Sequence, residues 1–505
     1  MAVTRNALSL VLLIVLATVP GAIRAEDAAL LIENAILVDG SGAPPRIADI
    51  RLRGDRIEAI GGLDAAAGEE IVDARGLVLA PGFIDTHSHH GSGLARDPDA
   101  LAAVSQGITT IVTGQDGGST LPLSEHFARL EADPAAVNVA SFSGHNTLRG
   151  AAMGEDYKRK ASAAEVEKMR LLLAADMKAG ALGLSTGLEY DPGIYSARDE
   201  VLTLAREAAG QGGRYISHIR SEDRYIWEAL DEVVEIGRRT RMPVQVSHAK
   251  LGMIDWWGQA DRFLAILDKA RAEGVNATID VYPYTYWQST LTVLWPERDF
   301  GSRAQAEYIL KHLVTPEGLL LTSYSPEPAL GGKTVAEIAA LRRTDPVTTL
   351  MALVRDMQST GGSARIIATG MDEGDIARLV AWPHANISSD GALADRHPRG
   401  AGAFTRFLRL YVREKKLMPI ETAIHKMTAL SAAHMGIADR GTIRPGAFAD
   451  LVLLDPAKVT DRATTARPDL LSEGIAKVWV NGRLVFDGGK ATGAHPGRVL
   501  RRASK

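Results

Sequence analysis

The stretch Pro81-Gly-Phe-Ile-Asp-Thr-His-Ser-His-His90 decides how the fold of this chain is interpreted. Apolar Phe83 and Ile84 are typical of the end of a buried strand. Two histidines, His87 and His89, follow two residues apart. Because alternate side chains of an extended strand point to the same side, we expect both imidazoles to meet one cation. Imidazole is a ligand suited to Zn²⁺; the alternative is a pair of surface histidines beside a loop.

Strand-like runs follow along the chain and alternate with helical stretches such as 164–178 and 226–238. The predicted strands span residues 82–89, 109–113, 137–143, 181–185, 215–218, 244–248, 277–282 and 386–390. Strands joined by helical crossovers predict an α/β fold, a parallel (β/α)8 barrel of the TIM type. Most chemistry-bearing residues fall at the C-terminal ends of these strands, where the active sites of such barrels lie.

Both ends of the chain have the composition of short β-strands separated by turn residues. The predicted strands are 30–38, 47–52, 56–60 and 70–73 near one end, and 449–454, 475–480 and 483–486 near the other. Asn481-Gly482 between two apolar runs is a strong hairpin signal. We therefore expect a small β-sandwich built from residues 26–80 and 441–505, around a barrel formed by residues 81–440.

One connection of the predicted barrel is far longer than a normal crossover. Residues 285–370 contain helical runs of their own and two tryptophans, Trp287 and Trp295. We interpret them as an insertion after the seventh strand that forms a lid over the barrel mouth. The alternative is a structural excursion that has no role in binding.

The first residues have the pattern of a secretory signal peptide. Arg5 precedes an apolar run from Ala7 to Val19, and small residues precede Glu26. The run is short for a membrane span, so a retained anchor is the less favoured alternative. We expect residues 1–25 to be removed and the mature protein to be periplasmic or secreted, without a membrane association.

Composition excludes several classes of partner. The 505 residues are 46% hydrophobic and 23% charged, as in an ordinary soluble enzyme of two or three structural units. The net charge of −4 and the lack of a basic stripe argue against a nucleic-acid ligand. A small-molecule substrate is expected, and an oligomer is possible.

Three further residues complete a metal-ligand pattern. His218 and His248 each end an apolar run that leads into Ser-His, and Asp390 follows the last predicted strand. A lone histidine at a strand end is often structural, and an Asp-Gly pair such as Asp390-Gly391 often forms a turn. Together with His87 and His89, however, they form a ligand set typical of metal hydrolases.

This set resembles the amidohydrolase superfamily, and more narrowly its D-aminoacylase (N-acyl-D-amino-acid deacylase) branch. The resemblance extends from about residue 31 to 485. Matching stretches are 81–89, 107–112, 180–188, 217–222, 247–250, 282–284, 388–391, 397–399 and 441–451.

The sequence departs from the family at one position. D-aminoacylases of the well-known type carry a metal-binding cysteine after the second strand, but this chain has no cysteine and reads Gly114-Gln-Asp116-Gly117. Other members use a lysine on the fourth strand, and residues 181–187 contain none. We interpret Asp116 as the substitute ligand, since carboxylates also bind divalent ions. The alternative is that Asp116 is only a turn residue.

The resemblance implies hydrolysis of N-acyl-D-amino acids or small D-residue dipeptides, with one or two Zn²⁺ ions. The implied metal ligands are His87, His89, Asp116, His218, His248 and Asp390, and Asp390 is the general acid/base. Candidate substrate-binding residues are Lys250, Arg220, Tyr190, Tyr282, Tyr284 and Arg399, because cations and phenols suit a carboxylate. The alternatives are a dipeptidase or cyclic-amide hydrolase of the same superfamily, or an exported binding protein with a degenerate metal site.

Overall fold

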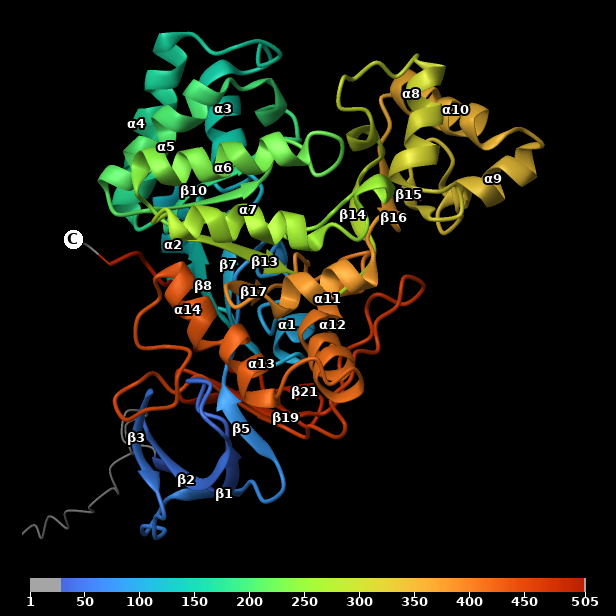
Figure 1. Ribbon diagram of the computed structural model, residues 1–505. Helices are drawn as coiled ribbons and strands as arrows, with labels where there is room; N and C mark the ends of the chain where they lie inside the picture. The colour runs from blue at the N-terminus through green and yellow to red at the C-terminus, as the bar shows by residue number, and fades with distance from the viewer. Residues whose placement is uncertain (1–28, 504–505) are drawn as a thin grey trace, which may run out of the picture.

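The computed structural model describes residues 29–503, and a ring of parallel strands lies at its centre (Figure 1). The eight strands are β6 (Phe83–Asp85), β7 (Ile108–Thr113), β8 (Asn138–Ser141), β10 (Gly183–Gly187), β11 (Arg214–His218), β12 (Val244–Val246), β13 (Ala277–Val281) and β17 (Ala385–Ile387). Short β9 (Ser143–Gly144) continues β8 and pairs with β10. Hydrogen bonds from Asp390 N–H to His87 O and from His89 N–H to Gly391 O, both 2.9 Å, join the segments that follow β17 and β6. The predicted α/β barrel of the TIM type is confirmed.

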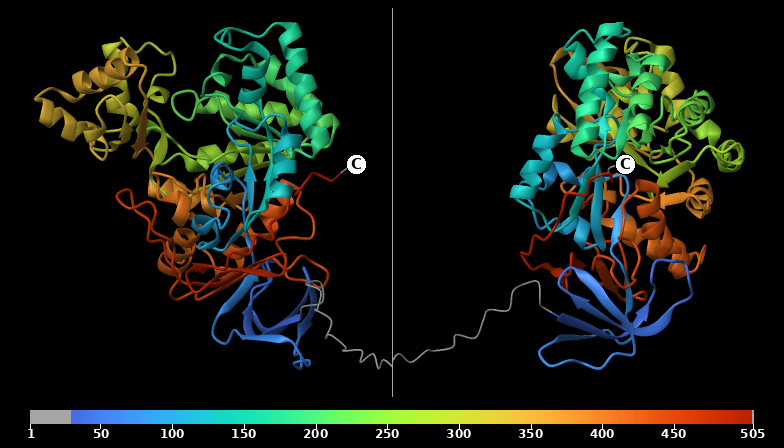
Figure 2. Two further views of the ribbon diagram at one scale, coloured as in Figure 1. Left: turned by 180° about the vertical axis from the view of Figure 1, so that it is seen from behind. Right: turned by 90° about the vertical axis from the view of Figure 1, so that its left-hand side faces the viewer.

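Helices surround the ring on its outer side (Figures 1 and 2). Those along the chain are α1 (Leu101–Val104), α2 (Leu123–Ala132), α3 (His145–Met153), α4 (Ala163–Ala179), α5 (Arg198–Gly210), α6 (Ile226–Thr240), α7 (Ala260–Ala272), α11 (Glu373–Ala381), α12 (Arg399–Arg406), α13 (Ile420–Met427) and α14 (Ala429–Met435). Every residue of β7 and β13 is buried, as expected for strands covered on both faces, although both strands also contain polar residues such as Thr110 and Asp280. Ser162 caps α4 in a reciprocal capping box with Glu165, which satisfies two free donors of its first turn.

Several barrel strands end earlier than the sequence predicted. β6, β12 and β17 stop two to four residues before their functional side chains, so that His87, His248 and Asp390 lie on the loops that follow. His248 and Asp390 have φ angles of 33° and 50°, which an extended strand cannot contain. The predicted strand 137–143 is likewise divided into β8 and β9.

Strands from both ends of the chain share one sheet. Its members are β1 (Ala29–Leu37), β2 (Arg46–Arg53), β3 (Arg56–Gly61), β4 (Glu70–Asp73), β5 (Val78–Pro81), β18 (Leu451–Leu454), β19 (Ile475–Val480), β20 (Arg483–Asp487) and β21 (Lys490–Ala491). The two halves meet where β5 pairs antiparallel with β18. The strands of this sheet therefore come directly before and after the barrel in the sequence. In space, the sheet lies at the opposite end of the molecule from α8–α10 in Figure 1.

Residues 287–368 form a separate lobe beside the barrel, visible in Figure 1 and in the left view of Figure 2. It contains β14 (Trp287–Thr290), β15 (Leu319–Tyr324), β16 (Ala364–Ala368), α8 (Arg303–Tyr308), α9 (Val335–Arg342) and α10 (Pro346–Ser359). The strands form a sheet of their own, and Trp295 is fully buried in a hydrophobic cluster that belongs to this lobe. The insertion is therefore a compact unit with its own core.

No helix within residues 29–503 is both long and apolar enough to cross a bilayer. The expected signal peptide, residues 1–25, lies outside the described residues.

Candidate metal centre

A cavity of about 1030 Å³ opens beyond the C-terminal ends of the barrel strands. Its floor includes His89, Asp116 and Asp390, and its walls come from the barrel loops and from the insertion. This is the position at which barrels of this type hold their active sites. Three of the predicted metal ligands therefore lie where an active site is expected.

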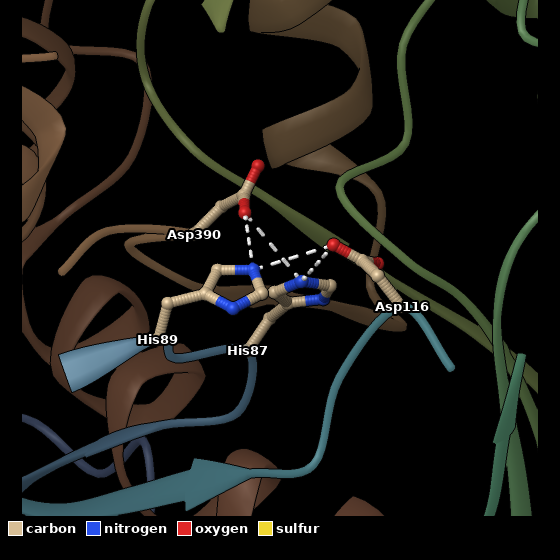
Figure 3. A group of neighbouring side chains, drawn as sticks. All are labelled: His87, His89, Asp116 and Asp390. Carbon is tan, nitrogen blue, oxygen red and sulfur yellow. Dashed lines mark ion pairs between the residues drawn. The ribbon is translucent and has the colours of Figure 1, made fainter. Parts of the chain in front are cut away.

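Two histidines and two aspartates converge on one point of the floor (Figure 3). The Nε2 atom of His87 lies 3.4 Å from Asp116 Oδ2 and 3.5 Å from Asp390 Oδ1. The Nε2 atom of His89 lies 3.3 Å and 3.2 Å from the same two oxygens. Zinc ligands in a tetrahedron, at bond lengths of 2.0–2.1 Å, are about 3.3 Å apart. The four nitrogen–oxygen distances thus match those between ligands of a tetrahedral zinc site.

A second group of ligand atoms shares Asp116 with the first. The other oxygen of Asp116, Oδ1, lies 3.2 Å from His248 Nε2, and this nitrogen lies 3.0 Å from His218 Nδ1. One carboxylate therefore faces both groups, each through a different oxygen. This geometry fits a carboxylate that bridges two cations.

The buried ring of His87 gives an independent test of whether a cation fits. Neither ring nitrogen of His87 has a hydrogen-bond partner among the described residues, although its side chain is completely buried. Leaving buried polar atoms without a partner is costly. A divalent ion bound to His87 Nε2 would remove this cost for one of the two nitrogens, so the donor set fits a metal.

The backbone is strained at three of these residues. Asp116, His248 and Asp390 have φ angles of 52°, 33° and 50°, in the left-handed region that few residues other than glycine adopt. Each such residue costs of order 1–3 kcal/mol, and such residues cluster at functional sites. The strain turns each side chain from the direction of its strand towards the common centre.

The charges of the site shift the pKa values of its members. Burial lowers the pKa of His89, but Asp116 and Asp390 outweigh it and raise that pKa to about 9. Burial also opposes ionisation of Asp390, yet the charges of Arg399 and His248 hold its pKa below the ordinary value. Burial lowers the pKa of His218 to about 4. His218 is thus a neutral ligand, whereas metal binding at His89 must displace a proton.

Three buried carboxylates behind the ligands were not predicted. Glu189 Oε2 lies 3.0 Å from His218 Nε2, Glu222 Oε1 lies 2.9 Å from His248 Nδ1, and Asp280 accepts a hydrogen bond from His248 N–H. Glu222 is four residues after His218 in the sequence. This spacing does not indicate a role for Glu222 unless the conformation of the loop between the two residues is known. Carboxylates in such places orient metal-bound histidines.

Two of the predicted substrate-binding residues, Tyr190 and Arg399, line the cavity. Arg399 also pairs with Asp390, and the ring of Tyr190 lies 4.2 Å from that of His218. Tyr282 lies directly behind, with the Arg399 guanidinium 4.8 Å from its ring centroid and Lys250 Nζ 5.9 Å away. The structure therefore gathers these four around one side of the metal ligands.

Arg220 and Tyr284 do not line the cavity. The guanidinium of Arg220 is held by Glu232 in two hydrogen bonds of 2.8 Å, so its charge is already compensated. The ring of Tyr284 is buried against Arg406, and its hydroxyl lies 3.4 Å from a backbone oxygen. Both side chains point into the protein because partners that the sequence does not reveal lie there.

Comparison with known proteins identifies the family. A model described as "Amidohydrolase family" matches residues 70–312 and 322–486. The chain belongs to the amidohydrolase family. N-acyl-D-glutamate deacylase of Alcaligenes xylosoxydans xylosoxydans is 40% identical over 498 residues, which cover 94% of this chain and 96% of that one.

Solved structures of amidohydrolases support the same family assignment. A D-aminoacylase structure, 35% identical, covers 94% of this chain and 99% of its own with a TM-score of 0.84. The N-acyl-D-glutamate deacylase of Bordetella bronchiseptica, complexed with zinc and a phosphonate inhibitor, is 39% identical with the same TM-score and covers 94% and 100%. The resemblance inferred from the sequence, including the D-aminoacylase branch, is confirmed.

Proposed function

We propose that this amidohydrolase uses zinc to hydrolyse the amide bond of N-acyl-D-amino acids or of small dipeptides with a D-residue. The observation that carries the proposal is the pair of ligand groups joined by Asp116, in which the nitrogen–oxygen distances match those between zinc ligands. The relatives named N-acyl-D-glutamate deacylase and D-aminoacylase supply the substrate class.

Asp390 is the proposed general acid/base. A divalent ion held by these ligands would polarise the scissile carbonyl and lower the pKa of water. Asp390 lies on the cavity floor with a depressed pKa, so it is ionised and able to accept a proton from water. The pairing with Arg399 keeps its carboxylate in place. The same carboxyl then returns the proton to the leaving amine.

The substrate carboxylate is proposed to bind between Arg399 and Tyr282. The hydroxyl of Tyr282 is buried and has no hydrogen-bond partner among the described residues, and the guanidinium of Arg399 lies over the same ring. A carboxylate there would satisfy the phenol and accept charge-assisted hydrogen bonds from the guanidinium. Tyr190 on the cavity wall and Lys250 behind it complete this side of the proposed site.

The insertion is proposed to act as a lid and a specificity wall. Ser289, Thr290, Arg298 and Arg365 of this lobe line the cavity. Arg365 is the exposed residue of the otherwise buried β16, and no described residue forms an ion pair with it. Arg396, which also lines the cavity, is likewise without an ion pair among the described residues. Two uncompensated cations favour an acidic side chain, as in the substrates named for the deacylases of N-acyl-D-glutamate and N-acyl-D-aspartate.

Amine release tests the function. Zinc content of the gently purified protein is measured first, and then free amine is measured after incubation with the N-acetyl derivatives of D- and L-glutamate, aspartate and leucine. We expect bound zinc and release from the D-isomers, with the acidic ones favoured. Stoichiometric zinc without any release would overturn the proposal in favour of a binding protein.

Export is proposed on the N-terminal pattern alone. Residues 1–25 would be removed, and the mature chain would begin near Glu26 in the periplasm or the medium. N-terminal sequencing of the protein from each cell fraction tests this, and an intact Met1 or Ala2 on membrane-bound protein would contradict it.

A further inference from the structure

Glu222 occupies a buried position between a metal ligand and a lysine. Its Oε1 atom lies 2.9 Å from His248 Nδ1, and its two oxygens lie 2.6 and 2.7 Å from Lys250 Nζ. Lys250 Nζ is itself 2.8 Å from the same His248 Nδ1. The side chains of Glu222, Lys250 and His248 are only 14%, 4% and 2% exposed. The ring nitrogen therefore faces both an acceptor and a donor, and all three side chains are largely shielded from solvent.

These two partners favour opposite tautomers of His248. A neutral imidazole carries one proton, on one of its two nitrogens. If Nδ1 donates to Glu222, the proton is on Nδ1 and the lone pair of Nε2 points to Asp116 and the metal position. If Nδ1 accepts from Lys250, the proton is on Nε2 and blocks metal binding there. The choice of partner thus decides whether His248 can be a ligand.

The carboxylate of Glu222 favours one of the two tautomers of His248 over the other. Glu222 accepts hydrogen bonds from the ammonium of Lys250 on both of its oxygens, which occupies two of the three donors of Lys250. At the same time its Oε1 atom lies 2.9 Å from Nδ1, close enough to accept a proton carried there. His218 has a carboxyl group of its own, that of Glu189, 3.0 Å from its Nε2, and its Nδ1 faces the metal position. No lysine competes for the ring of His218 among its described contacts.

We propose that Glu222 is a positioning residue that keeps His248 in its metal-binding tautomer against the competing ammonium of Lys250. The inference rests on the proposed zinc-dependent function, because it assigns His248 as a ligand. The competition between Glu222 and Lys250 has a consequence that the geometry of the ligands alone would not produce. Removing Glu222 exposes the imidazole to Lys250, so the damage should be repaired by also removing the lysine.

Four variants of the full mature chain test the proposal: Glu222→Ala, Lys250→Met, the double variant, and Glu232→Ala as a matched control. Glu232 is a buried carboxylate with a cationic partner, Arg220, and it contacts none of the proposed ligands. Zinc affinity is measured by competition with a chelator at one pH near neutrality, and thermal unfolding is followed in parallel.

Glu222→Ala should weaken zinc binding about 10- to 100-fold, the range for partners of metal-bound histidines. Lys250→Met and Glu232→Ala should bind zinc like the wild type, and the double variant should regain most of the loss. An affinity of Glu222→Ala equal to the wild type, or a double variant weaker than Glu222→Ala, would overturn the proposal. A wild-type protein that binds no zinc would instead refute the proposed function itself.

Discussion

Asp390 is the residue whose assigned chemistry is easiest to isolate. Replacement by asparagine keeps the shape and one oxygen for the metal, but it removes the base. We expect Asp390→Asn to lower the rate of hydrolysis by about 10²- to 10⁴-fold. The only other carboxylate on the described cavity floor is that of Asp116, which faces the two groups of metal ligands. Zinc content should stay near that of the wild type. Turnover within a few-fold of the wild type, measured by amine release, would reject this role.

Asp116 is the residue that joins the two groups of proposed metal ligands. Since its two oxygens face two ligand groups, Asp116→Ala should lose both zinc and activity while the fold is retained. Asp116→Cys should still bind zinc, since a thiolate is a preferred zinc ligand. The side chain of cysteine has a different reach, which affects the rate as well as the metal, so metal content is the decisive measurement. Full zinc and full turnover in Asp116→Ala would make Asp116 a turn residue.

At the scale of elements, the sequence predicted which strands exist better than where they end. The runs before His87, His218 and His248 were recognisable because each apolar strand leads into a histidine. Their ends were not, because positive φ angles at His248 and Asp390 depend on contacts with distant loops. The same limit applies to Arg220, whose partner Glu232 lies on the next helix. Local patterns reveal elements, whereas pairing between elements needs the structure.

The strand β16 supports a prediction about the insertion. Arg365 projects from β16 into the cavity without an ion pair among the described residues. Arg365→Ala should raise KM for N-acetyl-D-glutamate by about two- to fivefold, as loss of one exposed charge pair implies, and Arg365→Lys should raise it less. KM for N-acetyl-D-leucine should not change. An equal rise for both substrates would show that the residue shapes the wall and does not recognise an acidic group.

The helix α14 supports a prediction about acid stability. His434 donates from Nδ1 to Asn386 Oδ1 at 2.7 Å, and burial lowers the pKa of its imidazole to about 3. In the unfolded chain this imidazole takes up a proton near pH 6.5, whereas in the folded protein it does so only near pH 3. The free energy of unfolding is therefore not reduced by His434 above pH 6.5, and it declines as the pH falls towards 3. Between pH 6.5 and 5 the loss is about 2 kcal/mol. His434→Gln should therefore show a weaker loss of stability in urea unfolding at these two pH values; an identical loss would contradict it.

At the scale of the whole molecule, the proposed metal centre collects ligands from all around the ring. They follow β6, β7, β12 and β17 or end β11, so strands distant in sequence share one small volume. The insertion and the sheet of the two termini contribute none of these ligands. Bound zinc should therefore stabilise the barrel, whereas the stability of the insertion, which has its own core, should not change.

Removal of zinc tests this division. Binding to the folded state alone stabilises it by RT ln(1 + [L]/Kd), about 2.7 kcal/mol at a free zinc concentration of 100 Kd. For a chain of this length that corresponds to a rise in Tm of about 2–3 °C. Hydrogen exchange locates the effect: zinc should slow exchange in the loops after β6, β7, β12 and β17, and leave β15, β16 and α10 unchanged. Asp116→Ala should show neither response. Equal protection of the insertion would mean that barrel and insertion unfold as one unit, because a ligand can protect a segment without contacting it only if that segment opens together with the site.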